Sequence, residues 1–303
     1  MKVLFVCSGN SMFGVSPFVK EQGDSLRNQG IDVDYFLIKG NGIIGYLKNY
    51  PYLKRKIRLN KYNLIHAHYG LSGMLCVLQR KVPVIITFHG SDINNSYHRK
   101  FSKIAILLSA YNIFVHKSIR DKINAKNKNS IIPCGVNLNT FHLSNMMEAR
   151  KEIHLDLKKK YVLFAGSFDN RIKNSKLAIE SVKNISDTEL IELKGYNRNQ
   201  VSLLMNACDV ILITSFSEGS PQVIKEAMAC NLPIVSTDVG DVKEVIGNTE
   251  GCYITSFDPK DVAEKIKMAL DFGKRTNGRE NIKHLEINII AKRIIKLYNK
   301  VLA

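Results

Sequence analysis

Glu218 and Glu226 are well placed to do chemistry, because they stand on either side of an expected helix start. Glu218 lies in the turn before the helix and Glu226 lies inside it, within the stretch TSFSEGSPQVIKEAMA (214–229). Carboxylates accept hydrogen bonds from hydroxyl groups. At this separation Glu218 could bind the hydroxyls of a sugar while Glu226 binds the diol of a ribose. Spacing alone leaves a solvated helix face as an equally open interpretation.

The elements around the two carboxylates indicate what lies between them. The apolar run 209–214 predicts a buried strand, Ser220 suits an N-cap, and Pro221 suits the first helical position. The unpaired N–H groups of the first turn are then left to Gln222 and Val223. With the helix dipole behind them, these groups could hold a diphosphate.

His89 is a second candidate for chemistry. It follows an expected strand at 84–88 and opens the loop that contains Asp92. Open parallel sheets bind ligands at the carboxyl ends of their strands. The position therefore predicts a ligand contact for His89, with a purely structural loop histidine as the alternative.

Two patterns are typical of metal sites but lack the surroundings of one. Asp32 and Asp34 match a D-x-D signature, yet they open an expected strand, where alternation places both on one solvated face. His66 and His68 offer two imidazoles, with no Asp, Glu or Cys close by in the sequence to complete a site. We predict no metal, and expect His68 either near an acceptor at the strand end or as a structural histidine.

Apolar strands alternate with helix-length segments along the chain, which predicts an α/β fold of parallel sheets with helices on both faces. The pattern restarts after a polar passage at 145–160, so two Rossmann-like halves are expected. The expected strands are 3–7, 33–37, 64–66, 84–88, 113–115 and 131–132 in the first half, and 161–165, 190–193, 210–213, 234–236 and 252–254 in the second. Helices are expected at 258–270 and 287–302.

Composition limits the classes of partner. The chain has 303 residues, 45% of them hydrophobic, which is enough for two cores. A net charge of +17 favours anionic partners. The basic residues are spread out without a zinc-finger or recognition-helix pattern, so nucleic acid is not expected. The six cysteines form no C-x-x-C pair and are expected as buried free thiols. No apolar run has the length of a signal-peptide core or a membrane span, so we expect a cytoplasmic protein.

Five motifs together resemble those of the family-four retaining glycosyltransferases of the GT-B fold. SEGSPQVIKEAMACNLPIVSTDVGDVKEVI (217–246) is similar to the donor-site block of that family, with the two carboxylates of its E-x7-E motif at Glu218 and Glu226. The other matches follow in the family's order: FGVSPF (13–18), TFHGSD (87–92), IPCGVNLNTF (132–141) and GSFDNRIKN (166–174). The resemblance covers nearly the whole chain. SPFVKEQ and DYFLIKG further resemble the bacterial polysaccharide-building members.

The resemblance implies roles for the matching residues. Implied catalytic residues are His89, Lys173 and Glu218. Implied donor-binding residues are Gly14, Arg171, Gly219, Ser220, Pro221, Gln222, Val223 and Glu226. Implied acceptor-side residues are His68 and Asp92. One position departs from the family: Ser167 follows Gly166 where an Arg is usual, and Arg171 is the nearby candidate to replace it.

The expected GT-B architecture has two Rossmann-like domains facing across a cleft. The resemblance implies an acceptor-side domain at 1–145, a donor-binding domain at 146–285, and a helix at 286–303 that crosses back to the first domain. The implied function is metal-independent transfer of a sugar, with retention of configuration, from a nucleotide diphosphate sugar to a saccharide acceptor in polysaccharide synthesis. UDP is favoured over GDP, and no cofactor is needed.

Three alternatives remain open at this point. A sugar-nucleotide 2-epimerase shares the fold, and a catalytically weak binding subunit would explain the missing Arg at Ser167. The opening VLFVCSGNSMFGVSP resembles the phosphate loop of low-molecular-weight tyrosine phosphatases, but Phe13 occupies the position of the essential Arg. We therefore do not expect phosphatase chemistry.

The segment 45–59, GYLKNYPYLKRKIRL, combines aromatic and aliphatic residues with five basic ones. Basic amphipathic segments bind acidic head groups at membrane interfaces. Pro51 interrupts a single long helix, so a loop followed by a short helix is expected. We predict peripheral contact with an acidic membrane surface and a lipid-linked saccharide acceptor, with a surface helix that binds no lipid as the alternative.

Overall fold

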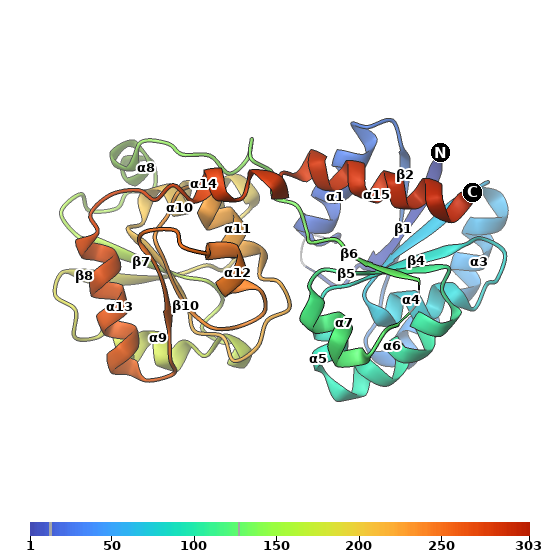
Figure 1. Cartoon of the computed structure of the whole chain (residues 1–303), viewed down its shortest axis with the longest axis horizontal. Coiled ribbons are helices and arrows are strands. Elements are labelled where there is room, and N and C mark those ends of the chain that lie inside the picture. The colour runs from blue at the N-terminus through green and yellow to red at the C-terminus, as the bar shows by residue number, and fades with distance from the viewer. Residues whose placement is uncertain (12–13, 127) are drawn as a thin grey trace. The chain divides into compact units, whose positions relative to one another are not determined.

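The computed structural model describes residues 1–11, 14–126 and 128–303, so Phe13 of the phosphatase-like loop lies outside the described residues. The chain divides into two compact units (Figure 1). Unit 1 comprises Met1–Gly135 and Ile287–Ala303, and unit 2 comprises Val136–Glu286.

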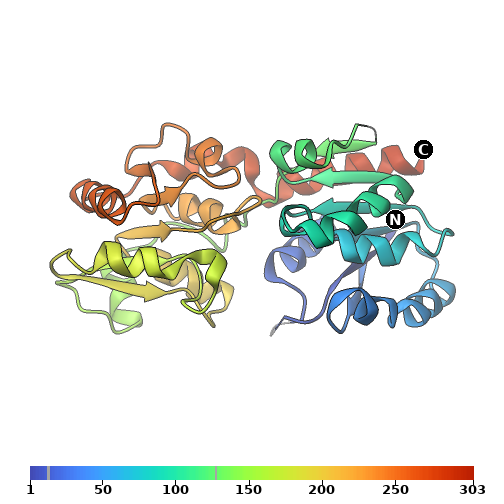
Figure 2. The same cartoon turned by 90° about the horizontal axis from the view of Figure 1, so that it is seen from below.

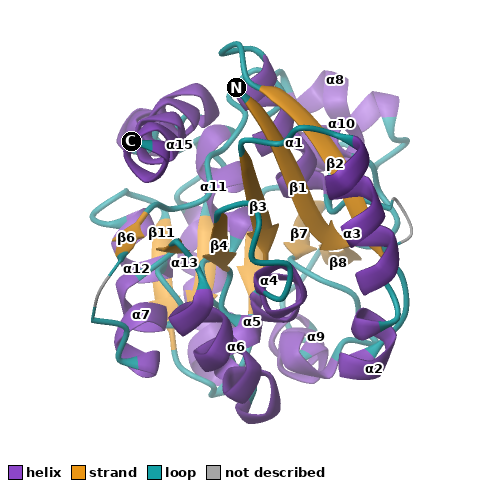
Figure 3. Cartoon of the chain, turned by 90° about the vertical axis from the view of Figure 1, so that its right-hand side faces the viewer, coloured by secondary structure: helices purple, strands orange, loops and turns teal. Residues whose placement is uncertain are grey.

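Unit 1 is built on a parallel sheet of six strands in the order β2-β1-β3-β4-β5-β6. Figure 3 labels β2, β1, β3 and β4 next to one another in this order. Strand β1 lies between β2 and β3 and is fully buried from Val3 to Val6, as expected for a strand covered on both faces. The strands are β1 (Lys2–Ser8), β2 (Asp32–Ile38), β3 (Leu64–His68), β4 (Val84–Phe88), β5 (Tyr111–Phe114) and β6 (Asn129–Ile131).

Helices cover both faces of this sheet. Helices α1 (Pro17–Arg27) and α15 (Ile287–Leu302) pack on one face, where Tyr298 of α15 is fully buried. Figure 2 looks onto the other face, where the helices run from blue to green along the chain. Those helices are α2 (Gly42–Leu47), α3 (Tyr50–Leu59), α4 (Gly70–Val77), α5 (Ser91–Asn94), α6 (Ser96–Leu108) and α7 (Lys117–Ile123).

Unit 2 has a five-stranded parallel sheet in the order β11-β10-β9-β7-β8. Its strands are β7 (Lys160–Phe164), β8 (Thr188–Glu192), β9 (Val210–Ile213), β10 (Ile234–Thr237) and β11 (Cys252–Thr255). One face packs on α10 (Arg198–Ala207), α11 (Gln222–Ala229) and α12 (Val242–Ile246), and the other on α9 (Ser175–Val182) and α13 (Pro259–Asp271). The remaining helices are α8 (Met146–Glu152), η1 (Arg171–Lys173), α14 (Gly278–Asn281) and η2 (Lys283–Leu285).

The expected α/β fold with two parallel sheets is confirmed, and each expected strand is present with its ends shifted by no more than a few residues. The boundary between the units, however, falls after Gly135 rather than after residue 145. Val136 and Phe141 are fully buried in the core of unit 2, and the Val136 N–H donates to the Leu285 carbonyl at 2.9 Å. The polar passage at 145–160 contributes α8 to unit 2, in agreement with the expected second domain from residue 146.

The segment 45–59 forms the end of α2 and all of α3. Pro51 is the second residue of α3, where its missing N–H costs no hydrogen bond, so it starts this helix rather than leaving a loop. Leu53 and Ile57 anchor α3 in the core. No helix in the described part of the chain is long and apolar enough to cross a membrane.

Candidate functional site

Lys173 and Glu218 meet in unit 2, although 45 residues separate them in the chain. Lys173 Nζ lies 2.7 Å from Glu218 Oε1, and the two side chains are 22% and 18% exposed. The Ser215 hydroxyl donates to the same carboxylate oxygen at 2.8 Å. The residues implied to bind the diphosphate and the sugar are therefore within reach of one ligand.

The local structure explains where Lys173 lies. It ends the short helix η1, and the Thr214 hydroxyl, directly after β9, donates to its main-chain carbonyl at 2.8 Å. Gly166 lies directly against the Lys173 stem: a Cβ on Gly166 would come within 2.7 Å of the Lys173 Cγ. The glycine after β7 thus leaves space for the lysine to lie across the strand end.

The turn before α11 corrects one expectation. Helix α11 begins at Gln222 with Pro221 at the N-cap, so Ser220 is not the capping residue. The Ser220 hydroxyl instead donates to Asp241 Oδ2 at 2.6 Å and accepts from Lys225 Nζ at 2.9 Å. Lys225 is fully buried. These two contacts hold the turn from inside the protein.

The loop after β10 supports the same turn. Gly240 has a left-handed backbone, with φ at 62°, and a Cβ there would lie 2.7 Å from the Gly219 carbonyl oxygen. A side chain at this position would push the two loops apart. Gly240 therefore allows the Gly219-Ser220 turn to pack tightly.

Glu226 is almost completely buried and has a partner that sequence reasoning missed. Its Oε1 lies 2.8 Å from Arg198 Nη1, and the exposed fraction of the Glu226 side chain is only 5%. The Arg198 guanidinium also lies over the Phe141 ring, 4.5 Å from its centre. Arg198 lies in the sequence GYNRNQV, in which no signal separates it from an ordinary surface arginine. The carboxylate that the resemblance implies for ribose binding is thus paired with a cation.

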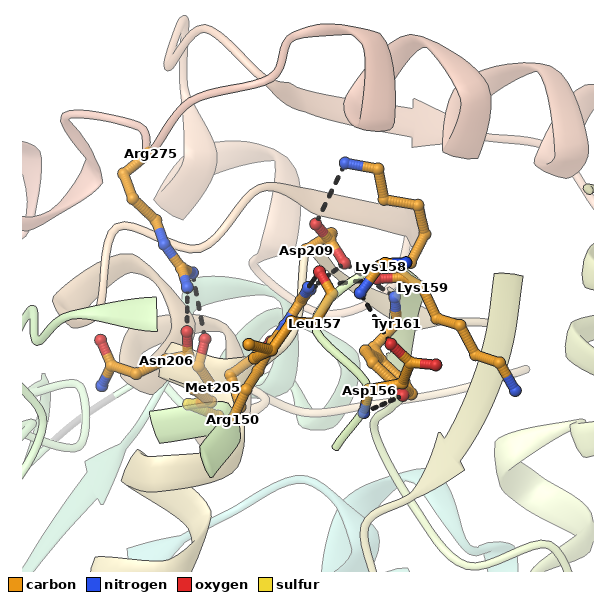
Figure 4. Close-up of polar contacts among 12 residues, drawn as sticks. Arg150, Asp156, Leu157, Lys158, Lys159, Tyr161, Met205, Asn206, Asp209 and Arg275 are labelled. Carbon is orange, nitrogen blue, oxygen red and sulfur yellow. Dashed lines mark hydrogen bonds and ion pairs between the residues drawn. The ribbon is translucent and has the colours of Figure 1, made fainter. Parts of the chain in front are cut away.

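Helix α10 carries Arg198 at its first position and is fixed at its opposite end by two arginines (Figure 4). Arg275 donates to the main-chain carbonyls of Met205 and Asn206, and Arg150 donates to that of Ala207 at 2.8 Å. Cations at the C-terminal end of a helix also complement its dipole.

Arg150 is itself held in place by a buried ion pair. Its Nη2 lies 2.7 Å from Asp209 Oδ2, with side-chain exposures of 4% and 11%. Because Arg150 binds both this carboxylate and the end of α10, the helix is tied to the start of β9. This arrangement fixes the start of α10, and Arg198 with it, relative to the sheet.

The position of the missing family Arg is occupied by a polar network. The Ser167 hydroxyl and the Phe168 N–H both donate to Glu192 Oε1, at 2.9 and 2.6 Å. Asp169, which also accepts from Ser167, is paired with Lys194 at 2.8 Å. Arg171 lies exposed at the start of η1 and makes no ion pair with the described residues. The untested replacement of the missing Arg by Arg171 remains a prediction.

In unit 1 the structure brings His68 and His89 together. His68 Nδ1 lies 3.2 Å from His89 Nε2, and His89 Nδ1 lies 3.7 Å from Cys134 Sγ. His68 is fully buried in β3, and burial, followed by the charges of His66 and His89, places its pKa well below the ordinary value. His68 therefore lies directly beside His89, and its implied place on the acceptor side stays a prediction.

Asp92 is also buried, and its implied acceptor-side role stays a prediction. Its Oδ1 accepts from the Gly90 N–H at 2.9 Å and its Oδ2 from the Gly70 N–H at 3.1 Å. Burial raises the pKa of Asp92 to about 6, against the lowering effect of these N–H donors. The carboxylate therefore organises the loop that carries His89.

Gly14 lies in a turn, as expected for a glycine before the first helix. Its φ is 71°, its N–H donates to the Ser11 carbonyl at 3.0 Å, and α1 begins at Pro17. A side chain is strained at such a φ, which accounts for glycine at this position.

The metal-like patterns have structural partners. Asp34 accepts from Lys56 at 3.1 Å and from the Tyr62 hydroxyl. His66 is bonded to the Tyr298 hydroxyl at 2.6 Å and to the Thr87 hydroxyl at 2.7 Å. Within residues 1–11, 14–126 and 128–303, no three His, Cys, Asp or Glu side chains are grouped as a metal site would require.

The thiol of the phosphatase-like loop is unsuited to nucleophilic attack. Cys7 lies buried in β1, and burial raises its pKa to about 12. A protonated thiol is a poor nucleophile.

Two family models match the chain. The model for Glycosyltransferase Family 4 matches residues 15–140, and the model for Glycosyl transferases group 1 matches residues 178–271. The chain belongs to the family-four glycosyltransferases, as its motifs predicted.

The chain also resembles several curated proteins. An uncharacterized glycosyltransferase of Methanocaldococcus jannaschii is 29% identical, over 76% of the chain and 72% of that protein. A putative teichuronic acid biosynthesis glycosyltransferase of Bacillus subtilis is 26% identical, over 67% of the chain and 60% of that protein. An N,N'-diacetylbacillosaminyl-diphospho-undecaprenol alpha-1,3-N-acetylgalactosaminyltransferase of Campylobacter jejuni is 34% identical, over 36% of the chain and 30% of that protein. The chain thus spans less than two thirds of the last two relatives.

Solved structures agree on the fold. Sucrose-phosphate synthase from Thermosynechococcus elongatus matches with a TM-score of 0.86 and 18% identity, covering 99% of both chains. The Anabaena protein HepE in complex with UDP-glucose matches with a TM-score of 0.75 and 16% identity, covering 99% of the chain and 100% of that protein. The fold is GT-B, as expected.

Proposed function

We propose that the protein transfers a sugar from a nucleotide diphosphate sugar to a saccharide acceptor, with retention of configuration and without a metal ion. The observation that carries the proposal is the ion pair of Lys173 and Glu218 beside the turn that opens α11. Lys173 would neutralise charge on the departing diphosphate, and Glu218 would bind sugar hydroxyls. Glu226, held by Arg198, would bind the ribose.

The anomeric configuration is retained if the acceptor attacks from the same face from which the leaving group departs. The departing phosphate oxygen would then help to remove the acceptor proton, so unit 2 needs no separate general base. UDP is the proposed nucleotide, supported by a structural neighbour that was solved in complex with UDP-glucose. The relative named for teichuronic acid biosynthesis supports a role in polysaccharide synthesis.

Calorimetric titration tests the donor site. UDP should bind with micromolar affinity, and Lys173→Ala should weaken binding roughly ten- to a hundredfold, because a cation–phosphate contact contributes roughly 1.5–3 kcal/mol. Ser175→Ala, two residues further along the chain, is the matched control and should bind as the parent protein does. Unchanged binding in Lys173→Ala would assign the diphosphate to Arg171 or to the α11 turn. Tight binding of GDP but not UDP would overturn the choice of nucleotide.

The anomeric configuration of the product tests the reaction. An NMR time course with a sugar donor and a saccharide acceptor should show a product with the donor's configuration, and an inverted product would refute retention. Epimerised donor formed without acceptor would favour the 2-epimerase alternative, and binding without turnover would favour the binding subunit.

The proposed acceptor is a lipid-linked saccharide at an acidic membrane surface on the cytoplasmic side. The named undecaprenol-linked substrate of the Campylobacter relative supports this acceptor class. Charge supports the membrane contact: between Asp34 and Asp121 the only acidic residue is Asp92, which is buried. All charged side chains on the surface of that span are therefore basic.

Helix α3 is the proposed contact element. Lys54, Arg55 and Arg58 are exposed, and Tyr52 and Leu59 beside them are 68% and 66% exposed. Each basic side chain near an anionic surface contributes on the order of 1 kcal/mol. Lys56, by contrast, pairs with Asp34 and is left out of the charge-reversed variant.

Liposome sedimentation tests this contact. Reversing Lys54, Arg55 and Arg58 to Glu should abolish binding to acidic vesicles at low salt. A control variant of equal net charge carries the same reversal at the exposed Lys183, Lys260 and Lys267 of unit 2 and should still bind. If the parent protein ignores acidic vesicles at low salt, or the control fails equally, the membrane contact through α3 is wrong.

A further inference from the structure

His89 has both ring nitrogens engaged within unit 1. One faces His68 Nδ1 at 3.2 Å and the other faces Cys134 Sγ at 3.7 Å. The His68 and His89 rings are within 22° of parallel, and their centres are 5.4 Å apart. Since the ring centres lie much farther apart than the two nitrogens, the rings meet edge to edge in one plane. This geometry is that of a directed hydrogen bond rather than of stacked faces.

The surroundings of His68 decide which nitrogen carries the proton. His68 is completely buried, and its Nε2 has no hydrogen-bond partner among the described residues. A neutral imidazole has one N–H, and buried N–H groups without an acceptor are rarer than buried acceptors without a donor. The proton therefore belongs on Nδ1, where His89 Nε2 can accept it.

We propose that His68 is the positioning residue of His89 and sets its tautomer. With His89 Nε2 accepting from His68, the His89 proton lies on Nδ1 and is donated to the Cys134 sulfur. Protonating His89 on Nε2 would force the His68 proton onto the partnerless Nε2 or set two N–H groups against each other. His89 consequently works as a neutral ring of fixed orientation and transfers no proton. This inference rests on the proposed function only where it concerns the rate of sugar transfer.

Other rings around the pair support a fixed orientation. Tyr69 and Phe18 contact His89 with ring centres 4.5 and 5.0 Å away, and Phe5 lies 4.9 Å from His68. The ring of His66 stacks on His68, with centres 4.7 Å apart, and its two nitrogens are bonded to the hydroxyls of Tyr298 and Thr87. His66 therefore offers a control that disturbs the same core without touching His89.

The test is the nitrogen NMR spectrum of histidine-labelled, full-length protein, with the His89 signals identified by their loss in His89→Gln. In the parent protein His89 should show a protonated Nδ1 and a bare Nε2. His68→Asn, whose amide N–H can replace Nδ1–H, should keep that pattern. His68→Leu should convert His89 to a mixture of tautomers. His66→Gln should lower the melting temperature and leave the His89 signals unchanged.

A protonated Nε2 on His89 in the parent protein would overturn the proposal. So would an unchanged tautomer in His68→Leu, or loss of the pattern in the Asn variant while it remains folded. The transfer rate in His68→Leu should fall on the order of tenfold, as loss of one hydrogen bond gives, with donor affinity unchanged. The spectrum needs no substrate, so failure of the proposed function would appear separately, as absence of nucleotide binding by unit 2.

Discussion

Removing Arg198 should destabilise unit 2, because it leaves the buried Glu226 carboxylate without its cation. Breaking a buried ion pair by deleting one partner costs about 3–5 kcal/mol. The Glu226 side chain is 5% exposed but that of Arg198 is 24% exposed, so water reaches one side of the pair. We therefore expect Arg198→Ala to cost about 2–3 kcal/mol, below that range.

This loss is measurable by calorimetry. For a domain of about 150 residues, each kcal/mol lowers the melting temperature by about 2–4 °C, so a decrease of roughly 4–12 °C is expected. Arg171→Ala is the matched control: Arg171 is exposed at the start of η1, and its removal should not change the melting temperature. UDP should also restore less stability to Arg198→Ala than to the parent protein, since Glu226 is no longer held for the ribose.

A double-mutant cycle isolates the pair. Glu226→Gln alone should cost less than Arg198→Ala, because Arg198 can turn toward water. In the double variant Arg198→Ala/Glu226→Gln, part of the loss should be recovered, with a coupling of about 1–2 kcal/mol. A melting temperature for Arg198→Ala within about 1 °C of the parent protein would refute the reasoning, since no buried charge would then depend on Arg198.

Further outcomes follow from other buried groups. Burial, with a smaller effect of the charge on His89, lowers the pKa of His66 to about 3, so the folded protein resists its protonation. Below pH 6.5 the unfolded chain binds a proton at His66 that the folded protein excludes, so the free energy of unfolding should fall by about 2–3 kcal/mol at roughly pH 4.5. In urea unfolding, His66→Gln should reduce this dependence on pH. Lys225→Met removes the buried donor to Ser220 and should lower the free energy of unfolding in urea by about 1–3 kcal/mol and weaken UDP binding. Unchanged UDP binding would show that the turn does not depend on this contact. Transfer activity should survive EDTA, and loss restored by a divalent ion would overturn metal independence.

The sequence predicted the strands better than it predicted the site. Strands are predicted by local apolar runs such as 210–213, and all of the expected strands are found. The boundary between the units was missed because Val136 and Phe141 are ordinary apolar residues that could pack in the core of either unit, and the fold places them in that of unit 2. The local sequence does not predict in which of the two cores they pack.

Contacts between distant residues account for the remaining differences. The motifs named Lys173, Glu218 and Glu226, but only the fold reveals that the first two form a pair and that Arg198 holds the third. Ser220 has the right residue type for an N-cap, yet Asp241 and the buried Lys225 draw its hydroxyl inward.

The ion pair of Lys173 and Glu218 leads to an unusual expectation for Glu218→Gln. A diphosphate that binds Lys173 must compete with the Glu218 carboxylate, which lies 2.7 Å from the same nitrogen. A neutral glutamine releases the lysine, so this variant should bind UDP a few-fold more tightly, as a gain of about 1 kcal/mol implies, while transferring sugar far more slowly. In the parent protein the same competition would assist donor binding, because a diphosphate that pairs with Lys173 leaves the Glu218 carboxylate able to accept hydrogen bonds from sugar hydroxyls. Weaker UDP binding by Glu218→Gln in calorimetry would show that the carboxylate helps to orient the lysine instead of competing for it, and the proposed exchange of partners would then be wrong.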